Sequence, residues 1–276
     1  MKLFRPRATN RAGQTANSPL DTPLNLLRAG RFAEAEAEAR AVAASRHWVH
    51  NDAYAPVALE LAAMAVEAQG RHTEAAAEYD ALLPVFGRAF GAEHLRTLEL
   101  RSNRAQTLAG LGRHAEGEAE FAAVARAASR GTGPRTARLV AAARNGLVFA
   151  LNGQGRYSEA EALAGESLAA YREDDQFSLV LRVNLARSLS GQGRHEEALA
   201  EAERADTLWH SLPEADRRLQ TGAVELALAT ALLGLGRTTE ARARATTAHD
   251  ACVATFGPDH RRTVEARELP ARVDGA

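Results

Sequence analysis

Cysteine, aromatic residues and long apolar runs are all scarce in this sequence. Its 276 residues include one cysteine, Cys252, so no intrachain disulfide can form. Aromatic residues make up 5% of the chain and alanine dominates the apolar residues, so we expect a helical core of small, closely packed side chains. No apolar run approaches the ~20 residues that a membrane-spanning helix needs. We therefore expect neither a disulfide framework nor a membrane span.

Charge of one sign is also lacking, because the formal net charge is -1. This balance predicts no general attraction to nucleic acid or to an anionic membrane. The local exception is an N-terminal segment with four basic residues before the first acid: Lys2, Arg5, Arg7 and Arg11. The segment has no apolar stretch of the kind found in secretory signals. We interpret residues 1–19 as a flexible basic tail and expect a cytoplasmic protein.

Motifs for catalysis are missing as well. The pentapeptide 165–169 resembles a nucleophile elbow but lacks its last glycine and lies in a predicted helix. The sequence has no phosphate-binding loop. Its Gly-Leu-Gly segments follow predicted helices rather than strands, so they do not match a dinucleotide-binding motif. His72, His114 and His195 occupy one repeated position about a repeat apart, too far for one metal ion. We expect no enzyme, no metal and no cofactor.

A six-residue signature dominates the sequence: Gly-Arg, two variable residues, then Glu and usually Ala. Its glycines are separated by 40, 42, 43, 38 and 43 residues. An apolar residue lies four positions before each glycine, and from the second unit a small residue lies seven before it. The six signature glycines are Gly30, Gly70, Gly112, Gly155, Gly193 and Gly236. Such a period of about 40 residues is typical of repeat architectures.

Each unit is predicted to be a helix, a glycine turn and a second helix. Apolar residues at i and i+3 before a glycine predict a helix end, and the Glu after it suits the first turn of the next helix. The predicted first helices are 20–29, 53–69, 95–111, 136–154, 176–192 and 215–235. The predicted second helices are 32–47, 72–86, 114–129, 157–172, 195–210 and 238–254. Hairpins of this kind bury their apolar faces by stacking.

A second motif fixes the register of the units. Residues 90–98, Phe-Gly-Ala-Glu-His-Leu-Arg-Thr-Leu, return 166 positions later as Phe-Gly-Pro-Asp-His-Arg-Arg-Thr-Val. After Thr263 a further helix begins, and we expect Pro270 to interrupt it and the segment 259–272 to cap the array. The predicted units are 20–50, 51–92, 93–134, 135–174, 175–213 and 214–258.

These features together resemble tetratricopeptide repeats, and the period and linker are similar to those of the kinesin-light-chain subtype. The resemblance covers about 24–268, and the Ala- and Arg-rich composition resembles that of actinobacterial proteins. It implies an all-α, right-handed superhelical solenoid whose concave groove binds another protein or peptide. Departures are Gly117 in place of the usual Ala and Pro23 in the short first helix.

Positions 13, 9 and 6 before each signature glycine share one helix face, and the resemblance implies that this face lines the groove. Asn103 and Asn184 match the family's groove asparagine, whose amide can both donate and accept. Arg187 could pair with a partner carboxylate. Met64 and Phe149 either form apolar pockets or pack against a neighbouring helix. The candidate groove residues are Glu99, Asn103, Gln106, Asn184, Arg187, Phe149, Met64 and Thr230.

A column of arginines eleven residues before the glycine, formed by Arg101, Arg144 and Arg182, is expected to reach acids on neighbouring helices and to serve structure. Two functions stay open. The first is an interaction scaffold or adaptor that holds a partner peptide in the groove. The second is a regulatory subunit that responds to a peptide or small ligand and acts on a partner protein. Self-association is possible with either.

Overall fold

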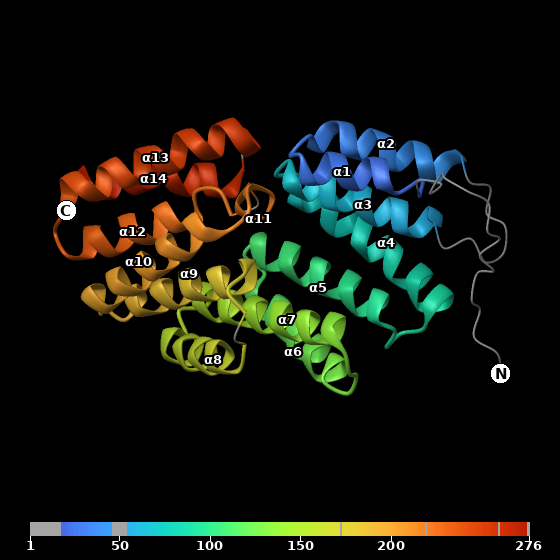
Figure 1. Cartoon of the computed structure of the whole chain (residues 1–276), viewed down its shortest axis with the longest axis horizontal. Coiled ribbons are helices and arrows are strands. Elements are labelled where there is room, and N and C mark those ends of the chain that lie inside the picture. Colours follow the sequence, from blue (N-terminus) through green and yellow to red (C-terminus); the bar gives the residue numbers. More distant parts are fainter. Residues whose placement is uncertain (1–17, 46–53, 172, 219, 259, 275–276) are drawn as a thin grey trace.

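The computed structural model describes residues 18–45, 54–171, 173–218, 220–258 and 260–274, and these residues form fourteen helices and no strand. Expectations for residues 1–17, most of the basic tail, fall outside this part of the chain. The helices run as antiparallel pairs that stack side by side around a curved array (Figure 1). None of the described helices is long and apolar enough to cross a membrane.

The first helices of the units follow the predicted ranges closely in five of six units. They are α1 (Asp21–Arg28), α3 (Tyr54–Ala68), α5 (Leu95–Gly110), α7 (Pro134–Gly153), α9 (Gln176–Gly191) and, in the sixth unit, α11 (Glu214–Arg218) with α12 (Ala223–Gly234). The second helices are α2 (Phe32–Ser45), α4 (His72–Phe90), α6 (His114–Ala128), α8 (Tyr157–Ala170), α10 (His195–Ser211) and α13 (Thr238–Phe256), and the chain ends with α14 (Arg261–Asp274).

Two expectations about these helices are wrong. The predicted helix 215–235 is split, because the chain turns at Gly222, whose φ of 75° lies in the left-handed region. A side chain at Gly222 would also collide with the sulfur of buried Cys252, 2.4 Å from the added Cβ. Pro270 does not interrupt the last helix, since α14 continues to Asp274.

The signature glycine ends each first helix in the same way. All six glycines have φ between 72° and 80°, a conformation that other residues adopt at a cost. The N–H of the following arginine donates to the carbonyl five residues earlier, for example Arg113 to Leu108 at 3.0 Å. This bond closes a Schellman-type cap that satisfies a helix-end carbonyl. The primary role of the signature is therefore to form the turn between the two helices of a unit.

The arginine and glutamate of the signature form an ion pair across each turn. The pairs are Arg31–Glu34, Arg71–Glu74, Arg113–Glu116, Arg156–Glu159, Arg194–Glu197 and Arg237–Glu240. Three of these arginines also reach back to the preceding unit, as Arg156 does to Glu118 and Arg194 to Glu161, both at 2.7 Å. Such exposed pairs contribute about 0–1 kcal/mol each, so they mainly fix the register of neighbouring units.

The histidines that resemble a metal set on paper have a packing role instead. The ring of His114 lies against Gly153 of the next unit, and that of His195 lies against Gly234. Tyr157 packs on Gly191 in the same way. A Cβ on any of these glycines would come within 2.5 Å of the ring, so the glycines make the room that these rings occupy.

The two copies of the linker motif have the same structure. Thr97 donates to the carbonyl of Gly91 at 2.7 Å, and Thr263 donates to the carbonyl of Gly257 at 2.8 Å. His94 and His260 each accept a backbone N–H two residues later. Phe90 stacks on His94, as Phe256 does on His260. The motif thus starts α5 and α14 by one mechanism.

The array curls until its two ends meet. Phe256, at the end of α13, stacks on Phe32 at the start of α2 with ring centroids 6.4 Å apart, and Arg218 of α11 donates to the carbonyl of Ala29. Figure 1 shows the red and blue ends facing each other across the top of the molecule. Consecutive first helices contact one another from α3 through α14. These helices therefore form the inner layer of a nearly closed ring.

Candidate functional site

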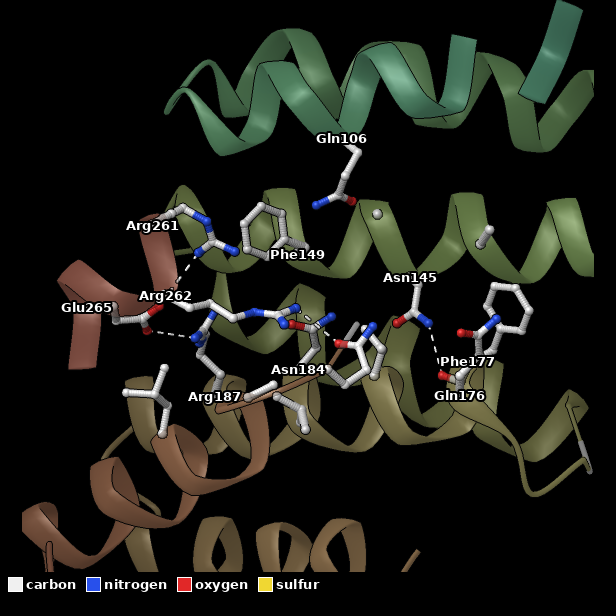
Figure 2. Close-up of a pocket in the computed structure, with 17 residues that line it drawn as sticks. Gln106, Asn145, Phe149, Gln176, Phe177, Asn184, Arg187, Arg261, Arg262 and Glu265 are labelled. Carbon is white, nitrogen blue, oxygen red and sulfur yellow. Dashed lines mark hydrogen bonds and ion pairs between the residues drawn. The ribbon is translucent and has the colours of Figure 1, made fainter. Parts of the chain in front are cut away.

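A cavity of about 240 Å³ lies on the inner surface of the ring, between the first helices and α14 (Figure 2). Four of the predicted groove residues line it: Gln106, Phe149, Asn184 and Arg187. They come from α5, α7 and α9, and Figure 2 shows Gln106 entering from the helix opposite Asn184. The repeated groove positions of three successive units thus converge on one cavity.

Four other predicted groove residues lie outside this cavity. Glu99 pairs with Arg135, and the Asn103 amide donates to Glu60 at 3.4 Å. The Thr230 hydroxyl donates to the carbonyl of Leu226 in its own helix. Met64 is 37% exposed. Whether these four residues contact a partner stays a prediction.

The last helix contributes the charged end of the cavity. Arg187 pairs with Glu265 at 2.7 Å, and Glu265 also lies 3.6 Å from Arg261. The Arg261 guanidinium sits over the Phe149 ring, 5.1 Å from its centroid, a favourable cation–π arrangement. Arg187 is thus already paired with a carboxylate of α14, and its pairing with a partner carboxylate stays a prediction.

The cavity is strongly positive for its size. Its charged lining residues are three arginines and one glutamate, which gives a net charge of +2. Burial lowers the pKa of Arg262 to about 10, so the guanidinium remains charged at neutral pH. The Arg262 guanidinium donates to the Gln220 side chain at 3.0 Å. A ligand with negative charge at this end is favoured electrostatically.

The opposite end of the cavity is polar but uncharged. Asn145 donates through Nδ2 to the carbonyl of Phe177 at 3.0 Å. Its amide oxygen is buried and has no hydrogen-bond partner among the described residues. An unsatisfied buried acceptor of this kind costs about 1–3 kcal/mol. A ligand N–H, such as a peptide amide, would satisfy it.

Several lining residues were missed by sequence reasoning. Asn145 lies ten residues before its glycine, between the positions taken as the groove face. Arg261, Arg262 and Glu265 belong to the segment 259–272, which the sequence predicts only as a cap of the array. The second copy of the linker motif, which leads into α14, is the one available signal, but the approach of α14 to α9 depends on the curvature of the whole ring.

A partly buried carboxyl group, that of Glu67 in α3, makes the stability of the protein depend on pH. Burial raises the pKa of Glu67 from 4.5 to about 7, and the Tyr79 hydroxyl lies 3.3 Å from its carboxylate. The folded protein then holds a proton between pH 4.5 and 7 that the unfolded chain releases, so the free energy of unfolding falls as the pH rises through this window.

We expect Glu67→Gln to remove that part of the pH dependence. Partial contact with solvent screens the charge and reduces the effect. We therefore expect the free energy of unfolding of the variant to exceed that of wild type by about 1–2 kcal/mol at pH 8 and to equal it near pH 4.5. Urea unfolding across this range measures the difference, with the exposed change Glu166→Gln as control. A variant that is less stable than wild type at pH 8 would contradict the prediction.

Comparison with known proteins identifies the repeats. Tetratricopeptide repeat models match residues 98–123, 140–173, 179–204 and 222–245. The chain contains tetratricopeptide repeats. A kinesin light chain from Podosopora anserina with nearly identical TPR-like repeats superposes with a TM-score of 0.54 at 18% identity, over 69% of this chain and 92% of that one. At this identity the likeness concerns the fold of the repeats. A search of curated proteins finds no match.

Two proteins of similar fold were solved with a factor or a peptide bound. Rap protein complexed with Competence and Sporulation Factor superposes with a TM-score of 0.65 at 13% identity, over 92% of this chain and 75% of that one. PlcR from Bacillus thuringiensis, in complex with the peptide PapR7 and DNA, superposes with a TM-score of 0.60 at 14% identity, over 83% of this chain and 77% of that one. At this level of identity the likeness concerns the fold.

Proposed function

We propose that this TPR protein binds a short peptide segment of a partner in the cavity of its inner surface. One observation carries the proposal: groove residues of three successive repeats converge on a cavity that also contains an unsatisfied amide oxygen. Asn145 and Asn184 supply amides suited to a peptide backbone, and Phe149 supplies an apolar surface. The three arginines supply attraction for an acidic residue or a terminal carboxylate.

The second candidate, a regulatory subunit that responds to a free peptide, is favoured by the small size of the site. A cavity of about 240 Å³ accommodates few residues. Rap and PlcR are arrays of this fold whose structures contain a factor or a peptide. Both candidates use the same residues, and they differ in whether the bound segment belongs to a larger protein.

The asparagines Asn184 and Asn103 provide a matched test, because they occupy the same repeat position. Asn184 lines the cavity, whereas Asn103 is bonded to Glu60 outside it. We expect a displayed library of random heptapeptides to yield ligands that bind wild type and Asn103→Ala alike. Asn184→Ala should weaken them at least tenfold, which corresponds to about 1.4 kcal/mol.

Equal binding to all three proteins, or no enrichment by wild type, would overturn the proposal. Circular dichroism melts of each variant check that the fold is kept. A ligand that is recovered from the library and matches a segment within a longer protein supports the scaffold, whereas a ligand that binds solely with a free terminus supports the peptide-responsive regulator.

A further inference from the structure

Three repeats share an ion pair between positions 19 residues apart. Arg101 of α5 pairs with Glu120 of α6 at 2.7 Å, and Arg182 of α9 pairs with Glu201 of α10 at 2.6 Å. In the last unit the charges are exchanged, and Glu225 pairs with Arg244 at 3.1 Å. The pair therefore joins the two helices of one hairpin at a fixed register, which confirms the structural role expected for Arg101 and Arg182.

The fourth unit breaks this pattern. Its arginine is Arg144 of α7, and the residue 19 positions later is Leu163. Arg144 is half-buried, and no described residue forms an ion pair or hydrogen bond with it, so the expectation that it reaches an acid on a neighbouring helix is wrong. A guanidinium offers five N–H donors in a planar fork, and leaving them without a partner at a partly buried position is unfavourable. The fourth unit therefore has the arginine but lacks a carboxylate to pair with it.

A second cavity opens beside this arginine. It has a volume of about 340 Å³, within the ~300–1,000 Å³ typical of small-molecule sites. Its walls are mostly apolar and include Val140 and Leu181. Ser167 also lines it and is 3% exposed, and its hydroxyl has no hydrogen-bond partner among the described residues. The cavity thus combines apolar walls with two polar groups that have no partner among the described residues, the Arg144 guanidinium and the Ser167 hydroxyl.

We propose that this cavity binds a small organic carboxylate with an apolar body. The carboxylate pairs with Arg144 in the bidentate geometry that guanidinium groups favour and accepts a hydrogen bond from the Ser167 hydroxyl. It gives Arg144 the kind of partner that Arg101 and Arg182 have in Glu120 and Glu201. The apolar part of the ligand lies against Val140 and Leu181. This cavity shares no lining residue with the inner one, so the inference does not depend on the proposed peptide binding.

A small molecule fits better than an acidic side chain of a protein partner. The lining combines the ends of α6 and α8, the 129–133 loop, one side of α7 and Leu181 of α9. It forms a separate cavity rather than an extension of the inner surface. Covering its apolar walls requires an apolar body joined directly to the carboxylate, which a short aspartate or glutamate side chain lacks.

The test is calorimetric titration of decanoate into the full chain, compared with the neutral decan-1-ol and with decyl phosphate. We expect saturable one-to-one binding of decanoate and at least tenfold weaker binding of the alcohol. Arg144→Ala and the near-isosteric Arg144→Gln should each weaken decanoate at least tenfold. The matched control is Arg138→Ala, which removes an exposed arginine from the same helix.

A further variant tests the register directly. Leu163→Glu restores the acid of the other repeats opposite Arg144, and we expect it to abolish decanoate binding while circular dichroism shows an unchanged helix content. Absence of saturable decanoate binding to wild type would overturn the proposal. So would decanoate binding by both Arg144 variants as tight as that of wild type, wild-type affinity for decan-1-ol equal to that for decanoate, or a preference for decyl phosphate.

Discussion

Replacement of Phe121 by alanine is expected to lower the free energy of unfolding by about 3–5 kcal/mol, the range for large aromatic side chains removed from a core. Phe121 is 1% exposed and packs between units three and four. Its ring lies where a side chain of Gly146 would be, within 2.3 Å of an added Cβ. Because glycine cannot extend into the space, the cavity left by the substitution stays empty.

Urea unfolding followed by circular dichroism measures this loss, with Phe149→Ala as the matched control. Phe149 is half-buried on the same helix as Gly146, so we expect Phe149→Ala to lower the free energy of unfolding by about 1–2 kcal/mol. A loss below about 1 kcal/mol for Phe121→Ala would show that the helices collapse onto the cavity.

A double-mutant cycle with Gly146 sharpens the prediction. Gly146→Ala alone should destabilise the protein by about 1–3 kcal/mol through overpacking against the ring. In the Phe121→Ala background the same change should stabilise by up to about 1 kcal/mol, because the clash is gone and alanine favours the helix. A substitution whose sign reverses in this way demonstrates direct contact.

The second large effect concerns ring closure. Phe256→Ala removes the stacking on Phe32 and on His260. We expect the free energy of local opening for α1 and α2 to fall by about 1.5–3 kcal/mol. Amide hydrogen exchange in these two helices should accelerate at least tenfold, since a factor of ten corresponds to about 1.4 kcal/mol.

Phe90→Ala is the matched control for closure. Phe90 occupies the same position in the first copy of the linker motif and packs on Phe86 and His94, away from the junction of the two ends. It should leave exchange in α1 and α2 unchanged. Equal acceleration by both variants would mean that the ends are held by something other than the Phe32–Phe256 contact.

The candidate site shows where sequence reasoning succeeds and where it stops. Asn184 and Gln106 could be predicted because a helix repeats its faces with a fixed period, and the signature glycine gives every unit the same origin. Arg261 and Glu265 could not, because they follow Arg187 by more than seventy positions and meet it through the accumulated curvature of several hairpins. Small rotations between repeats add up, and no local pattern encodes their sum.

The sequence by itself determined the repeat, its register and the boundaries of most helices, because glycine turns and apolar periodicity act over a few residues. It also placed Arg144 in one column with Arg101 and Arg182, but only the structure showed which of these arginines have an acidic partner. The tertiary structure alone decided that the ends of the array meet, that α14 supplies Glu265 to Arg187, and which groove residues share a cavity. These outcomes depend on packing between residues far apart in the chain, and that packing is set by the fit of whole helices rather than by any short segment.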